Sequence, residues 1–273
     1  MTRLKYIAVL VFGYFLLNSC EKVIDIDLEE SNSAIVIEAN LTNKKIPVTV
    51  LVSKTSSYFG SETGFPVSGA KVSLKVENGN PKYLNEVEPG VYLLEKSNAQ
   101  TGYWYSVNVV YEGVTYTARS FLNKSVPILD LDFSYFDGFG VFDSGYLANC
   151  YIRDPAETEN YYRIKYYVNG EPVNEQDGIT LFSDKLFNGN EIGLSHRSFV
   201  FLKTDTLTVE LQSIDKAAYD YFSTLESISG PSWQQNAAPA NPTSNFSNGA
   251  LGYFSAYSYE QKTVLVKDYL KKQ

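Results

Sequence analysis

The sequence predicts an all-β protein with an N-terminal β-sandwich and a β-rich C-terminal domain, either a sandwich or a partial barrel, that carries one helix. Three observations lead to this prediction: many aromatic residues, short stretches in which apolar and polar residues alternate, and turn residues between them. The chain has 273 residues, among them 22 Tyr and 16 Phe, and such side chains fit the half-buried surface of a pleated sheet. This length is enough for two ordinary domains.

Residues 34–125 carry the clearest strand pattern. In YWYSVNVVY (103–111) five residues are predicted to lie on one face with a period of two: Tyr103, Tyr105, Val107, Val109 and Tyr111. Frequent Gly and Pro turn signals between short strands are typical of a β-sandwich. The other strand-like stretches here are AIVIEA (34–39), IPVTVLVS (46–53), PVSGAKVSLKV (66–76), GVYLLE (90–95) and VTYTARS (114–120). Their order resembles transthyretin-like and carboxypeptidase-regulatory-like modules, which implies that fold for residues 34–125.

Residues 126–273 form the predicted second domain, after the polar linker candidate NKSVPI (123–128). YYRIKYYV (161–168) alternates with a period of two, as a strand does. We expect SFVFLK (198–203) to pair with TLTVELQS (206–213), whose Leu207, Val209 and Leu211 point inward. The stretches ALGYFSAYS (250–258) and KTVLVK (262–267) are predicted to be two further strands.

One helix is predicted near residues 215–228. The residues at helical spacing are Ile214, Ala218, Phe222 and Leu225, and Gly230-Pro231 ends the pattern. A long loop rich in Pro, Asn and Ser then covers residues 230–249. A loop of this length is uncommon unless it has a function or packs by itself.

The first twenty residues predict a secretory signal. Arg3 and Lys5 form a short basic region, and residues 6–17 form an apolar run of about a dozen residues. That run is shorter than the ~20 residues of a spanning helix but suits a signal peptide. It ends in Leu17-Asn18-Ser19-Cys20, which resembles the bacterial lipobox. An ordinary secretory signal with a structural cysteine is the alternative.

The lipobox resemblance implies that the signal peptide, residues 1–19, is removed and that Cys20 carries acyl chains such as palmitate. Residues 20–33 then form a lipidated tether, and more than one acyl chain anchors a protein durably. No Asp follows Cys20 directly, which favours the outer membrane. The acidic residues behind Cys20 loosely resemble the surface-export signal of Bacteroidota lipoproteins. We therefore expect a protein anchored by lipid in the outer membrane and facing the cell surface.

Charge and rare residues exclude several classes of function. The net charge is −8 and the sequence has no Lys/Arg cluster, which argues against nucleic acid as a partner. If Cys20 is acylated, Cys150 is the one remaining thiol, so no internal disulfide forms. Its apolar context predicts a buried, inert thiol. His196 is the single histidine, and without a visible nucleophile or second His we interpret it as a surface residue.

Two kinds of candidate binding residue remain. Two Asp-x-Asp pairs, at Asp25/Asp27 and Asp130/Asp132, lack the loop and ligand number of a calcium site, so we expect no metal and no cofactor. Aromatic residues on loops suit sugar stacking or a protein anchor, and packing between the two domains is the alternative role that we favour. The aromatic candidates are Phe136, Phe139, Phe142 and Trp233.

Several stretches together resemble one family. VIEANLT, PVSGAKVSL, GVYLLE, the YSVNV and YTARS hairpin, and the late NPTSNFSNGALGYFSAYS resemble Bacteroidota lipoproteins of unknown function whose genes lie beside those of TonB-dependent receptors. The late stretch is the most specific part. The resemblance implies a non-enzymatic accessory to such a receptor, in ligand capture or in covering the barrel. The alternatives are a structural or adhesive surface protein and, less favoured, a hydrolase.

Overall fold

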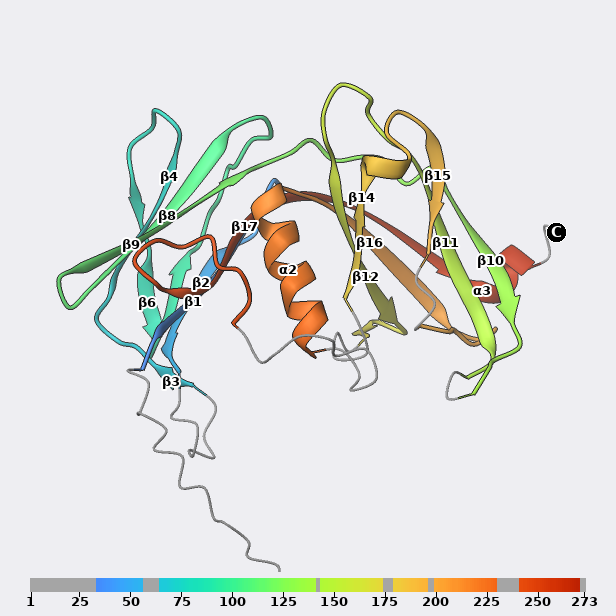
Figure 1. The fold of residues 1–273 in the computed structure, drawn as a ribbon, viewed down its shortest axis with the longest axis horizontal. Coiled ribbons are helices and arrows are strands. Elements are labelled where there is room, and N and C mark those ends of the chain that lie inside the picture. Colours follow the sequence, from blue (N-terminus) through green and yellow to red (C-terminus); the bar gives the residue numbers. More distant parts are fainter. Residues whose placement is uncertain are drawn as a thin grey trace, which may run out of the picture. The chain divides into compact units, whose positions relative to one another are not determined.

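We describe the protein from a computed structural model (Figure 1). The structure describes residues 33–55, 64–140, 143–173, 179–195, 199–229 and 241–270. The described residues all belong to one compact unit, residues 33–273. Strands dominate this unit, which confirms the predicted all-β class. Within the described ranges, none of the helices has the length and apolar character that crossing a bilayer requires.

One large sheet extends through both halves of the chain. Among the described residues it contains ten strands, in the order β13-β12-β16-β17-β1-β2-β7-β6, with β14 beside β12 and β3 beside β2. Their bounds are β1 (Ile35–Thr42), β2 (Val48–Lys54), β3 (Phe65–Pro66), β6 (Asn85–Glu88), β7 (Val91–Leu94), β12 (Tyr161–Val168), β13 (Glu171–Pro172), β14 (Thr180–Ser183), β16 (Thr206–Ile214) and β17 (Leu251–Leu265).

Two smaller sheets pack on this large sheet, one on each half. The order β5-β4-β8-β9 forms the first and β10-β11-β15 the second. The bounds are β4 (Lys71–Val76), β5 (Lys82–Tyr83), β8 (Trp104–Tyr111), β9 (Val114–Phe121), β10 (Asp130–Phe136), β11 (Gly145–Arg153) and β15 (Glu191–Leu194). The first core joins Ile37 and Val50 to Val107, and the second joins Tyr162 and Leu207 to Ile152. The alternating residues of the predicted strands thus fill two separate cores.

Strand β17 contributes to both halves. Residues 251–257 pair in parallel with β1, and residues 258–265 pair antiparallel with β16. The prediction of two separate strands, ALGYFSAYS and KTVLVK, was therefore wrong. The two stretches belong to one continuous strand, and its polar side chains have hydrogen-bond partners on neighbouring strands. Gln261 donates to Glu210 at 2.7 Å, and Lys262 donates to Asp130 at 3.0 Å.

The predicted pairing of residues 198–203 with β16 was also wrong. β16 has β12 on one edge and β17 on the other, so no edge is left for another strand. Phe201 instead forms an isolated bridge with Tyr146 of β11. The Asp205 carboxylate accepts the Leu202 N–H at 2.7 Å and so stabilises a turn in place of a hairpin.

Helix α2 (Lys216–Ser229) confirms the predicted helix and lies against the large sheet (Figure 1). Ala218 and Phe222 are buried in a third apolar cluster together with Ile214 of β16. Asp215 caps the helix, since its carboxylate accepts the Ala218 N–H at 3.0 Å. Two shorter elements are a 3₁₀ turn, η2 (Asp184–Leu186), and helix α3 (Val266–Leu270).

The cores cross the predicted division between residues 34–125 and 126–273. Phe254 and Ala256 of β17 belong to the first core, while Val264 of the same strand belongs to the second. The division into two domains stays a prediction. The structure shows that the last strand supplies side chains to both cores.

Candidate functional site

The aromatic residues predicted as binding residues follow β10. Phe136 ends β10 and is half-buried, whereas Phe139 in the next loop is 82% exposed. Phe142 and Trp233 lie outside the described residues. The structure adds Tyr135, which is 59% exposed and contacts Tyr146 edge-on, with ring centroids 5.2 Å apart. The binding role of these aromatic residues stays a prediction.

The other predicted residues do not form a metal or nucleophile site in the described ranges. Cys20, His196 and the Asp25/Asp27 pair lie outside those ranges. Asp130 accepts a hydrogen bond from Lys262, and Asp132 accepts the Phe133 N–H at 2.7 Å. Among the residues that the structure describes, no three His, Cys, Asp or Glu side chains gather as a metal site requires.

Cys150 lies on β11 and is 1% exposed, which confirms the predicted burial. Burial raises the pKa of its thiol to about 12. Since the thiolate is the reactive form of cysteine, this side chain acts as a small apolar residue of the second core.

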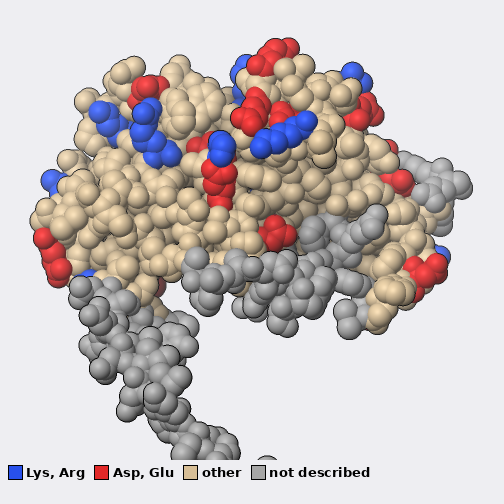
Figure 2. Space-filling view, in the orientation of Figure 1, with Lys and Arg blue, Asp and Glu red and all other residues tan. Residues whose placement is uncertain are grey.

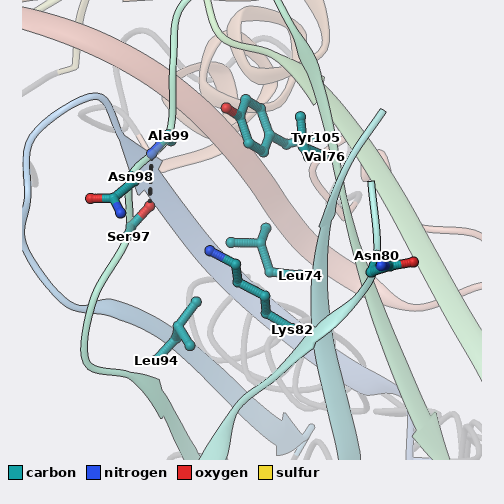
Figure 3. A pocket seen from close by; sticks show the side chains of 9 residues that line it. All are labelled: Leu74, Val76, Asn80, Lys82, Leu94, Ser97, Asn98, Ala99 and Tyr105. Atoms are coloured by element: carbon teal, nitrogen blue, oxygen red, sulfur yellow. Dashed lines mark hydrogen bonds between the residues drawn. The ribbon is translucent and has the colours of Figure 1, made fainter. Parts of the chain in front are cut away.

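The N-terminal sandwich contains a cavity of about 80 Å³ at one end (Figure 3). β4, β5 and β8 of one sheet line it on one side, and β7 with the loop behind it lines the other. Its floor is apolar and its rim is polar. The floor residues are Leu74, Val76, Leu94, Ala99 and Tyr105; the rim residues are Asn80, Lys82, Ser97 and Asn98.

Lys82 supplies the only charge in the lining of this cavity. Figure 3 shows its amino group pointing into the cavity, toward the segment that carries Ser97 and Asn98. In the described part of the chain, the side chains of Lys82, Asn80 and Asn98 have neither a hydrogen bond nor an ion pair. The other polar groups are engaged locally: Ser97 Oγ accepts the Ala99 N–H at 3.3 Å, and the Tyr105 hydroxyl bonds the Gln100 backbone.

A second hollow, of about 170 Å³, lies on the other face of β1 and β2 and includes Tyr257 of β17. Glu38 supplies the only charge in its lining. Asn40 donates to the Tyr253 hydroxyl at 3.1 Å, and burial raises the pKa of Tyr257. The two hollows thus carry single charges of opposite sign. Figure 2 shows acidic and basic side chains mixed over the face that it displays, without a broad basic patch among its coloured residues.

Comparison with known families gives one match, which covers most of the chain. The model of a domain of unknown function, DUF4249, matches residues 21–263. The chain belongs to this family. No curated protein matches the chain. Among solved structures, it is similar to a segment of two fibronectin type III domains from chicken tenascin, with 12% identity and a TM-score of 0.23, over 67% of this chain and 91% of that chain. So low a TM-score carries no argument about the fold.

The DUF4249 match includes the late stretch that the sequence marks as most specific, and the structure gives this stretch a structural role. The Asn245 side chain bonds both the N–H and the carbonyl of Phe254. The Ser247 N–H donates to Thr117 at 2.9 Å, so the segment covers the outer edge of β9. Asn248 and Gly249 have positive φ angles of 55° and 73°, a conformation that glycine adopts without strain.

Sequence reasoning missed the cavity of this DUF4249 protein. The strand pattern places Leu74, Val76 and Tyr105 on inward faces, and this much could be predicted. Lys82, however, follows the turn NGNP and looks like a solvent-exposed residue. No sequence signal indicates which end of a sandwich its side chains leave unfilled.

Proposed function

We propose that the protein is a non-enzymatic, lipid-anchored protein of the outer membrane that faces the cell surface and assists a TonB-dependent receptor in nutrient uptake. It captures a ligand for the receptor or covers the mouth of the barrel. The observation that carries the proposal is the cavity of the N-terminal sandwich. An apolar floor with a few polar groups at its rim is the usual lining of a small-molecule site.

The cavity supports binding over catalysis. Ser97 and Lys82 line the same space, but no hydrogen bond joins them. A serine nucleophile needs a base within hydrogen-bond reach, so this pair lacks the arrangement of a hydrolase. Cys150, the remaining thiol in the described ranges, is buried with a raised pKa.

The location rests on the N-terminal sequence. Leu17-Asn18-Ser19-Cys20 resembles a lipobox, and the family match begins at residue 21, directly behind the predicted lipidated cysteine. Changing Cys20 to Ala is expected to release the protein from the membrane fraction, because the acyl chains supply the anchor. Fractionation followed by immunoblotting measures this, and full retention of the variant would contradict the lipid anchor.

Co-purification tests the receptor. The lipidated protein is extracted from outer membranes in mild detergent and isolated, and its partners are identified by mass spectrometry. A TonB-dependent receptor recovered in near-equal amount supports the proposal, whereas a lone monomer would contradict it. The exposed Tyr135 and Phe139 would then favour the structural or adhesive alternative, which requires neither a small ligand nor a receptor.

A further inference from the structure

The cavity of the N-terminal sandwich combines an apolar floor with a lysine at its rim. Leu74 is 5% exposed and Tyr105 is 6% exposed, and the other floor residues are half-buried. Lys82 at the rim has no ion pair in the described residues, although acidic residues outnumber basic ones, 31 to 23. A lysine stem can cover apolar surface while its amino group stays in water, but here the amino group points into the cavity (Figure 3).

The hydrogen-bonding groups of the rim favour an anionic ligand. The ammonium of Lys82 offers three donors and no acceptor, whereas the amides of Asn80 and Asn98 can both donate and accept. Among the described residues no carboxylate lines the cavity. A ligand group that pairs with Lys82 must therefore bring acceptor oxygens, and a negative charge makes the hydrogen bonds stronger.

The single cation and the small volume of the cavity limit the charge and the size of the ligand. A phosphate group carries close to two negative charges at pH 7, whereas the described residues of this lining hold one Lys and no Arg. One negative charge balances one lysine. The volume of about 80 Å³ admits a short branched or aromatic group and excludes a long acyl chain.

We propose that this cavity binds a small monocarboxylate with an apolar body. Its carboxylate pairs with Lys82, and its body contacts Leu74, Leu94 and the Tyr105 ring. The inference deepens the proposed function, on which it rests, by naming the class of ligand captured. The carboxylate has two sources, a free branched acid or the C-terminal residue of a peptide.

Ligand-observed saturation-transfer NMR tests this on the full lipidated chain in maltoside micelles. One probe is 4-methylpentanoate, a free acid, and the other is the peptide acetyl-Ala-Leu with a free C-terminus. The matched controls are 4-methylpentanamide and the same peptide with an amidated C-terminus. Each acid is expected to bind about 10- to 100-fold more tightly than its neutral amide, the difference that one charge-assisted hydrogen bond makes. The acid that binds more tightly shows whether the natural ligand is a free acid or the C-terminus of a peptide.

Variants locate the site. Lys82→Gln is expected to weaken acid binding about 10- to 100-fold while leaving the amide unchanged. Lys96→Gln is the matched control, because Lys96 lies on the same loop side but does not line the cavity, and it should bind like the parent chain. Equal binding of acid and amide, an unaffected Lys82→Gln variant, or no binding of either acid would each overturn the proposal. None of these outcomes depends on a receptor. Failure of ligand binding can therefore be told apart from failure of the receptor co-purification.

Discussion

The two halves of the protein bury different kinds of polar group. In the described residues before 126, the buried polar side chains all carry hydroxyl groups. They are Thr42, Ser73, Ser97 and Ser120. In the described residues after 126, the buried side chains include five acids and one arginine. These are Asp154, Asp184, Asp205, Glu210, Asp215 and Arg163. The first half is therefore held by apolar packing and strand pairing, and the second half adds buried charge.

The buried acids of the second half hold its irregular segments. Asp154 accepts hydrogen bonds from the Tyr162 hydroxyl and the Gly189 N–H. Asp184 accepts the Asn160 N–H at 2.7 Å. Buried backbone N–H groups need partners, and loops cannot obtain them from a neighbouring strand. In the first half the Glu86 carboxylate also accepts backbone N–H groups, from Gly69 and Gly90, but it is exposed. The comparison teaches that the loops of the second half differ in depending on carboxylates that are buried.

The strongest test concerns Gly252, where β17 lies beside Ile37 of β1. A Cβ atom at this position would lie 2.1 Å from the Ile37 carbonyl oxygen, and the φ angle is +89°. Gly252→Ala is expected to cost at least about 3 kcal/mol in free energy of unfolding, or to prevent folding, because both the strand contact and the backbone resist it. Urea unfolding followed by circular dichroism measures the loss.

Gly249→Ala is the matched control for Gly252→Ala. Gly249 also has a positive φ angle, +73°, but an added Cβ would meet nothing within 4 Å. Its expected cost is about 1 kcal/mol, the backbone penalty alone. Equal costs for the two variants would mean that the close approach of β17 to β1 does not matter for stability.

A second test compares one buried tyrosine from each half. Tyr92 donates to the Val67 carbonyl and accepts the Ala70 N–H, both at 2.9 Å, whereas Tyr162 donates to the Asp154 carboxylate. Tyr162→Phe is expected to cost about 2 to 3 kcal/mol and Tyr92→Phe about 1 kcal/mol, since hydrogen bonds to charged groups contribute more. Thermal and urea unfolding of both variants measures the difference. If Tyr92→Phe lowers the free energy of unfolding as much as Tyr162→Phe does, a buried charged partner adds no stability over a neutral one.

The smallest expected effect is a pH dependence at Asp215. Burial raises the pKa of this carboxyl, although backbone hydrogen bonds from Ala218 and Phe121 act in the opposite direction. The folded state therefore holds the proton more tightly than the unfolded state, so the wild type loses stability as pH rises from about 3.8 through the raised folded-state pKa. Asp215→Asn keeps a good helix cap without this titration.

Urea unfolding of wild type and Asp215→Asn between pH 3 and pH 7 measures this effect. The stability of the wild type relative to the variant is expected to fall as pH rises, and then to level off. A relative stability that rises with pH would show that the hydrogen bonds of the cap lower the pKa of Asp215 more than burial raises it.

The sequence predicts much of the fold because alternation identifies a strand wherever one face is buried. Leu207, Val209 and Leu211 are all buried as expected, and helix α2 differs from its predicted range by one residue at each end. Partners far apart in the chain could not be predicted. Val36 pairs with Leu251, and no local pattern specifies that contact.

The buried acids and the cavity escaped prediction for a related reason. Asp154 lies in RDPAETEN, which looks like an ordinary polar turn, and only the packing around it shows that its carboxylate is buried. The cavity depends on how far side chains from two different sheets fill the space between them. Such properties belong to pairs of distant segments and not to a single stretch of sequence.

The parallel pairing of β1 with β17 has a consequence for the order of folding. The first strand of the described chain obtains its parallel neighbour from the last one, so the first core cannot close while the chain is still emerging N-terminus first. Contacts between such distant segments slow folding. Until the last part of the chain arrives, the edge of β1 that pairs with β17 and the edge of β9 that residues 245–248 cover remain open, and unpaired strand edges promote aggregation. The first core must therefore be kept from self-association until β17 is available.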